Sequence, residues 1–164
     1  MRILGIDPGL NTTGYGVIES DDFKLVEAGI IRTKANTPIH ARLDKIFKNI
    51  SELIEEHRPE ALVLEKIYSH YKHPATAILM GHARAMACLV CGKFNVRLVN
   101  YPSTRIKKSI AGNGRASKHQ IQRMVQGILR LKEPPEPADV SDALAMAISY
   151  GMELQRQIPT TENR

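Results

Sequence analysis

The first thirty residues of the chain alternate between short apolar runs and polar turns. The apolar run Ile3–Ile6 leads directly to a carboxylate, Asp7, and Pro8-Gly9 then turns the backbone, because proline fixes φ and glycine tolerates a positive φ. A second apolar run begins at Tyr15, and residues 23–32 are rich in β-forming side chains. The pattern predicts an antiparallel meander of three strands, the first of which ends in Asp7.

Helices and single strands alternate through the rest of the chain. Apolar residues recur every three or four positions after Thr37-Pro38, which is typical of an amphipathic helix capped by Thr37. The uninterrupted apolar run 61–64 ends in Glu65 and predicts a central strand covered on both faces. The elements predicted beyond it are an alanine-rich helix over 74–93 ended by Gly92, a strand over 96–99, a basic helix over 103–110 capped by Ser103, a helix from the cap Ser117 to about 131, and a last helix with Asp139 and Asp142 in its first turns.

The composition fits one α/β domain. The chain has 164 residues, 43% of them hydrophobic, and we place the domain at residues 1–157, followed by a polar tail (158–164) that we expect to be disordered. Asp7 interrupts the opening apolar run before it is long enough for a signal peptide. We find no run approaching the ~20 apolar residues of a membrane span, and therefore expect a cytoplasmic protein with no membrane partner.

Positive charge is concentrated in one segment. Between Arg97 and Lys132 lie nine of the 23 Lys and Arg residues and none of the 17 Asp and Glu residues, although the net charge of the whole chain is only +6. A segregated basic region predicts a polyanionic partner, and we favour nucleic acid. The simpler alternative is a solvated charged surface.

Four acids stand where they could converge. Asp7 and Glu65 each end an apolar strand, and neighbouring strands lie about 4.8 Å apart. Asp139 and Asp142 are three residues apart, so they share one face of a helix. Four carboxylates brought together need a cation, and hard oxygen ligands select Mg²⁺ or Mn²⁺, two of which can assist a phosphodiester displacement. Alternatively, the helix acids complement the helix dipole and the strand-end acids are turn residues.

Several stretches together resemble one family, the RuvC family of bacterial Holliday junction resolvases, over residues 3–152. The resemblance implies an RNase H-like fold, which is a five-stranded mixed β-sheet flanked by α-helices. It also implies a homodimer that nicks two opposite strands of a four-way DNA junction symmetrically, with divalent metal. The stretches that carry it are Ile6–Gly9 with Thr13–Val17, Leu64–Tyr68, Lys107–Gln122 and Ala138–Ala147.

The family's acidic tetrad is matched by Asp7, Glu65, Asp139 and Asp142, which the resemblance makes catalytic and metal-binding residues, with two Mg²⁺ ions (or Mn²⁺) per site. Tyr68 stands where the family usually has Phe, an aromatic side chain that stacks on bases of the opened junction.

Basic residues of the family that face the DNA are matched by Lys107 and Lys118, and we add Arg105 from the same basic segment. Lys66 replaces a frequent Gln and adds charge beside the site, with an effect that the sequence does not predict.

The resulting hypothesis is a metal-dependent, structure-selective endodeoxyribonuclease that resolves four-way junctions in recombination and repair, with a RuvA–RuvB type branch-migration complex as a further partner. Two alternatives stay open, an RNase H-like nuclease that acts on RNA and a noncatalytic junction-binding protein. An ATP-binding protein of the actin-like superfamily is disfavoured, because 164 residues leave no room for its second domain. The preferred cleavage sequence and the dimer geometry are not predictable from the sequence.

Overall fold

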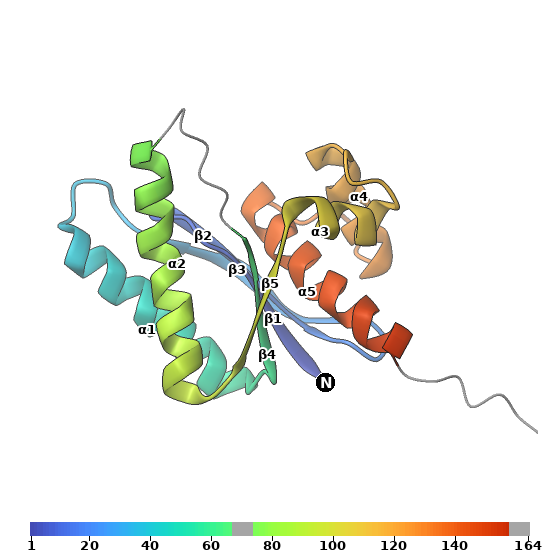
Figure 1. Cartoon of the computed structure of the whole chain (residues 1–164), viewed down its shortest axis with the longest axis horizontal. Coiled ribbons are helices and arrows are strands. Elements are labelled where there is room, and N and C mark those ends of the chain that lie inside the picture. The colour runs from blue at the N-terminus through green and yellow to red at the C-terminus, as the bar shows by residue number, and fades with distance from the viewer. Residues whose placement is uncertain (67–73, 158–164) are drawn as a thin grey trace, which may run out of the picture.

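A computed structural model of the chain describes residues 1–66 and 74–157, which contain five strands and five helices (Figure 1). The strands are β1 (Arg2–Asp7), β2 (Thr12–Glu19), β3 (Lys24–Arg32), β4 (Ala61–Glu65) and β5 (Arg97–Tyr101). The helices are α1 (Ile39–His57), α2 (Pro74–Phe94), α3 (Ser103–Ala111), α4 (Lys118–Ile128) and α5 (Ala138–Gln157).

The five strands form one mixed sheet in the order β3-β2-β1-β4-β5. The meander β1–β2–β3 is antiparallel, as the sequence predicted, whereas β4 and β5 extend the sheet in parallel beside β1. Helices α1 and α2 cover one face and α3, α4 and α5 cover the other (Figure 1). The apolar core is therefore divided into two halves by the sheet, and β1 and β4 are buried on both sides.

Helix α5 lies directly on the backbone of β1 and β2 because glycines of these strands face it. A Cβ atom added at Gly5 would lie 1.9 Å from the carbonyl oxygen of Ala143, and one added at Gly14 would lie 2.1 Å from that of Asp139. Any larger side chain at either position would push the helix away. This close packing sets the N-terminal end of α5 over the end of β1.

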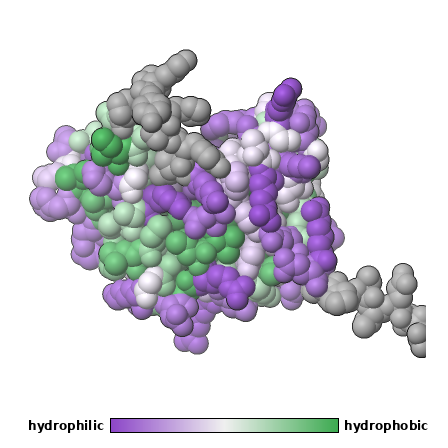
Figure 2. All heavy atoms as spheres, viewed as in Figure 1, coloured by the Kyte–Doolittle hydropathy of each residue, from purple (hydrophilic) through white to green (hydrophobic). Residues whose placement is uncertain are grey.

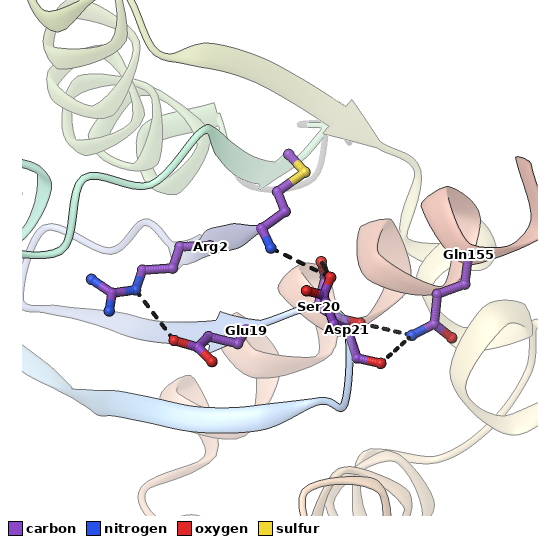
Figure 3. A network of polar contacts seen from close by, with 6 residues as sticks. Arg2, Glu19, Ser20, Asp21 and Gln155 are labelled. Atoms are coloured by element: carbon purple, nitrogen blue, oxygen red, sulfur yellow. Dashed lines mark hydrogen bonds and ion pairs between the residues drawn. The ribbon is translucent and has the colours of Figure 1, made fainter. Parts of the chain in front are cut away.

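The other end of α5 is fastened to the turn between β2 and β3 (Figure 3). The side-chain amide of Gln155 donates hydrogen bonds to the carbonyl oxygens of Ser20 at 2.7 Å and Asp21 at 3.2 Å. Next to this turn, the Arg2 guanidinium pairs with the Glu19 carboxylate at 3.5 Å across β1 and β2. The orientation of α5 is thus fixed at both of its ends.

Two predicted helix caps are wrong and one is confirmed. Pro38, not Thr37, precedes α1, and Ser103 is already the first residue of α3. Ser117 caps α4 as predicted, because its hydroxyl accepts from the Gln120 N–H while the Gln120 side chain accepts from the Ser117 N–H.

Three predicted boundaries also shift. Gly92 does not end α2, which continues to Phe94 because the chain turns only at Asn95, where φ is +54°. Strand β5 spans residues 97–101 instead of 96–99, and α4 ends at Ile128 rather than near 131. The predicted disordered tail, 158–164, lies outside the described residues.

Helix α2 is mostly apolar. Its segment Ala75–Phe94 has a mean hydropathy of 1.4 and only 22% of it is buried, so by length and composition it could cross a membrane. The prediction that no segment approaches a membrane span is therefore wrong by that criterion. In the fold, α2 packs Ala83, Ala87 and Val90 into the core beneath the sheet. Figure 2 shows apolar side chains gathered on the side of the molecule where α2 lies.

Candidate active site

The two strand-end acids lie side by side at one edge of the sheet. Strands β1 and β4 are parallel neighbours whose ladder ends with the pair Ile6 and Leu64. Asp7 and Glu65 are the next residues on the two strands. Because side chains alternate between the two faces of a sheet, both carboxylates lie on the face that α5 covers. The sequence prediction that these acids converge depended on strand adjacency, which the sheet order confirms.

The two helix acids approach this edge from the first turns of α5. Asp142 lines the same pocket as Asp7 and Glu65. Asp139 packs against Gly14, which is the residue opposite Asp7 in the β1–β2 ladder. The structure therefore brings all four predicted acids to one place.

The pocket has a volume of about 350 Å³ and a mixed lining. Helices α3 and α4 also line it and contribute Ser103, Lys107 and Lys118. Met80 of α2 and Met146 of α5 supply apolar surface. The cavity thus presents carboxylates and ammonium groups to the same space, as a site for a metal ion and a phosphate would require.

The carboxylates are close enough to disturb one another's ionisation. The pKa of Asp7 is raised from 3.8 to about 7, first by burial and then by the charges of Asp142, Asp139 and Glu65. Burial also raises the pKa of Glu65, while a hydrogen bond from Ser103 acts in the opposite direction. A bound cation would favour the ionised form of both carboxylates.

Lys118 supplies part of that positive charge. Its ammonium nitrogen lies 3.3 Å from Oδ2 of Asp142. The Asp142 carboxylate raises the pKa of Lys118, and Asp7 and Asp139 act in the same direction. The predicted basic residues Lys107 and Lys118 are therefore both part of the acidic pocket.

Arg105, also predicted to contact DNA, does not line this pocket. The Arg105 guanidinium lies 2.7 Å from Oε2 of Glu153 and 4.3 Å from the ring centroid of Tyr101, on a different side of α3. Tyr68 lies outside the described residues. The prediction that these two side chains contact DNA stays a prediction.

Another group of possible metal ligands lies on the opposite face of the sheet. Glu27, Glu56 and His57 place their ligand atoms within 4.8 Å of one another, and no other three His, Cys, Asp or Glu residues in the described ranges 1–66 and 74–157 do so. Both oxygens of Glu27 already have partners, the hydroxyl of Tyr15 at 2.8 Å and Nε2 of His57 at 2.6 Å. The tetrad is more open than this group, and its hard oxygen donors suit Mg²⁺ or Mn²⁺.

Sequence reasoning missed two residues at the site. Ser103 was interpreted as a helix cap, although its position two residues after the short strand β5 was the available signal for a role beside Glu65. Arg84 was overlooked inside the alanine-rich helix, where a lone arginine in an apolar segment is the signal. Its guanidinium donates a hydrogen bond to the carbonyl oxygen of Glu65 at 2.9 Å.

Comparison with known proteins decides the family. The family profile described as "Crossover junction endodeoxyribonuclease RuvC" matches residues 3–150. The crossover junction endodeoxyribonuclease RuvC of Rhodopirellula baltica is 47% identical over 148 residues, which cover 89% of this chain and 83% of that protein. The chain belongs to the RuvC family.

Solved structures agree with this assignment. Thermus thermophilus RuvC superimposes with a TM-score of 0.88 at 29% identity, covering 95% of this chain and 96% of that one. The same protein in complex with a Holliday junction substrate gives a TM-score of 0.87 at 28% identity, with the same coverage. The predicted RNase H-like fold and the predicted class, a crossover junction endodeoxyribonuclease of the RuvC family, are thereby confirmed.

Proposed function

We propose that this RuvC-family chain hydrolyses phosphodiester bonds of four-way DNA junctions, using divalent metal held by Asp7, Glu65, Asp139 and Asp142. The observation that carries the proposal is the state of Asp7. This carboxylate is half-buried, the charges of Asp142, Asp139 and Glu65 act on it, and its pKa is raised to about 7. A protein gains nothing in stability from such a group, so the cluster is best explained by a cation that it binds.

The residues have distinct roles in this proposal. Bound Mg²⁺, or Mn²⁺ in its place, would supply an activated water and would stabilise charge on the leaving oxygen, and two ions per site fit four carboxylates. Asp7 and Glu65 provide ligands from rigid strand ends, whereas Asp139 and Asp142 provide them from α5. Because four acids share the site, protons that remain on them at low pH compete with metal.

The basic side of the pocket would position the DNA. Lys118 and Lys107 lie on α4 and α3 and line the same pocket as the acids, where their ammonium groups can meet a phosphate next to the scissile bond. Arg105, on the outer side of α3, would contact the backbone further along the strand.

A homodimer would provide the two active sites that paired nicks require. Large apolar side chains are exposed along α2, including Ile78 at 60% and Leu89 at 55% of their full exposure. Contiguous exposed apolar surface marks an interaction site, and a two-fold axis through α2 would match the two-fold symmetry of a four-way junction (Figure 2). A DNA substrate would place this activity in the cytoplasm, with branch-migration proteins of the RuvA–RuvB type as further partners.

A substrate panel tests the proposal against its alternatives. A four-way junction, a linear DNA duplex and an RNA–DNA hybrid would be incubated with the protein in Mg²⁺ or in EDTA. We expect paired symmetric nicks in the junction alone, and only with Mg²⁺. Preferential cleavage of the hybrid would favour the RNase H-like alternative, and junction binding without cleavage would favour the noncatalytic one.

A further inference from the structure

The backbone of Glu65 is held by an arginine from a different element. Nη1 of Arg84, on α2, donates a hydrogen bond to the Glu65 carbonyl oxygen at 2.9 Å. Nη2 of the same guanidinium donates to the side-chain oxygen of Asn100 on β5. The half-buried arginine therefore links the C-terminal ends of β4 and β5 to α2.

The Arg84–Glu65 hydrogen bond lies just beyond the end of the β1–β4 ladder. The β1–β4 ladder ends at Leu64, so Glu65 has no ladder partner on β1. On its other side, Glu65 is next to Tyr101 of β5, whose carbonyl oxygen accepts from the N–H of Lys66 at 2.8 Å. Arg84 thus donates to the Glu65 carbonyl at the point of β4 that has no ladder partner on β1.

Arg84 contacts the site through hydrogen bonds to neutral groups and not through an ion pair. Both of its hydrogen-bond partners are neutral oxygens, and it forms no ion pair with a carboxylate in the described part of the chain. The forked guanidinium can reach two acceptors at once in a fixed geometry, which a lysine cannot do. Its effect on the site must therefore operate through the position of the Glu65 backbone.

The same helix reaches the pocket at a second point. Met80, one turn before Arg84, lines the cavity that contains Asp7 and Glu65. The opposite side of α2 bears the exposed Ile78 and Leu89. The helix that would carry the dimer contact is therefore hydrogen-bonded to the backbone of one acid of the site.

We infer that Arg84 is a positioning residue for Glu65, and that it transmits the placement of α2 to the active site. The inference rests on the proposed function, since it requires Glu65 to act as a metal ligand. Without the guanidinium, the Glu65 carboxylate is displaced from the other three acids. Metal use then suffers while the DNA-binding surface stays intact, because Lys107 and Lys118 lie on α3 and α4.

The test compares Arg84→Gln and Arg84→Lys with Lys93→Gln. Lys93 is on the same helix, and its ammonium lies 5.2 and 5.3 Å from the ring centroids of Phe47 and Phe94, so its replacement controls for the loss of one charge from α2. Junction cleavage is measured against Mg²⁺ concentration, and junction binding is measured in EDTA. We expect Arg84→Gln to raise the Mg²⁺ concentration for half-maximal cleavage by about 10–100-fold, as is typical when support of a metal ligand is lost. Binding should change by less than about twofold, and Lys93→Gln should behave like the parent.

A chemical rescue separates positioning from a general structural role. Guanidinium ion added at millimolar concentration should restore part of the cleavage by Arg84→Ala, ammonium should not, and Arg84→Lys should lie between the parent and Arg84→Gln. A parent-like Mg²⁺ dependence of Arg84→Gln would overturn the inference. Equal losses of binding and cleavage would overturn it too. Absence of any Mg²⁺-dependent cleavage by the parent would instead overturn the proposed function.

Discussion

Lys118 is bound to Asp142 across the active-site pocket, with its ammonium nitrogen 3.3 Å from Oδ2. Each group has another role in the proposed reaction, since Asp142 would bind metal and Lys118 would bind phosphate. The two partners come from the first turns of α4 and α5, 24 positions apart. The pair therefore neutralises part of the acidic site, and it must separate when metal and DNA bind.

Replacing Lys118 should have opposite effects on metal binding and on cleavage. In Lys118→Ala, the ammonium no longer competes for Asp142, so we expect Mg²⁺ to bind a few-fold more tightly at low salt, in keeping with the ~0.2–1 kcal/mol of an exposed ion pair. Cleavage should fall because a phosphate contact is lost. Calorimetric titration with Mg²⁺, beside a junction cleavage assay, measures both. Weaker Mg²⁺ binding in the variant would show that Lys118 does not oppose the metal.

The raised pKa of Asp7 predicts a pH-dependent stability of the metal-free protein. Between about pH 4 and pH 7, the native state keeps a proton on Asp7 that the unfolded state releases, because the pKa is about 7 in the fold and 3.8 outside it. The free energy of unfolding should therefore fall by a few kcal/mol as pH rises through this window and level off above pH 7.

Chemical denaturation in EDTA across this pH range, on the parent and on Asp7→Asn, checks this. The free energy of unfolding should decline much less with pH in the variant. In the parent, Mg²⁺ in place of EDTA should reduce the decline at pH 7 and above. Stability curves that run parallel for the two proteins would contradict a raised pKa at Asp7.

Gly14 should be intolerant of substitution because α5 rests on it. A Cβ atom at Gly14 would lie 2.1 Å from the carbonyl oxygen of Asp139, so Gly14→Ala must displace the first turn of α5. We expect a loss of about 1–3 kcal/mol in the free energy of unfolding, and a loss of cleavage in the fraction that folds. Gly92→Ala is the control, since a Cβ atom there meets nothing within 4 Å. The control should gain about 0.5–1 kcal/mol from its position within a helix.

The exposed apolar side of α2 predicts the dimer contact. Leu89→Glu places a charge on this side and should convert a dimer to a monomer in sedimentation velocity experiments, with its circular dichroism spectrum unchanged. Ile39, at the start of α1, is also exposed, at 43%, and Ile39→Glu serves as the control. A dimer that persists in Leu89→Glu and dissociates in Ile39→Glu would place the interface elsewhere.

Much of the fold was predictable because local signals were strong. The apolar run before Asp7, the run before Glu65 and the capping box at Ser117 each identify an element without reference to the rest of the chain. The end of α2 was not predictable in this way. A glycine within a helix costs only about 0.5–1 kcal/mol relative to alanine, which the packing of α2 on the core can offset, and the chain turns only at Asn95.

The relationships within the site are less accessible to sequence reasoning. The four acids could be selected from their positions, but the Lys118–Asp142 contact depends on how α4 packs on α5. Arg105 belongs to the basic segment, yet Glu153, 48 positions later, pairs with it. Such pairings across the fold carry no local signature, and a charge count assigns the same weight to every lysine and arginine in the segment.

The most direct test of the account is the behaviour of Asp7→Asn on a four-way junction. Asparagine keeps the size of the side chain but removes its negative charge, whereas the basic surface is untouched. If Asp7 binds the metal, we expect the variant to bind the junction as the parent does and to produce no nicks at any Mg²⁺ concentration. Cleavage by the variant at the parent's rate would contradict the claim that these acids hold the metal.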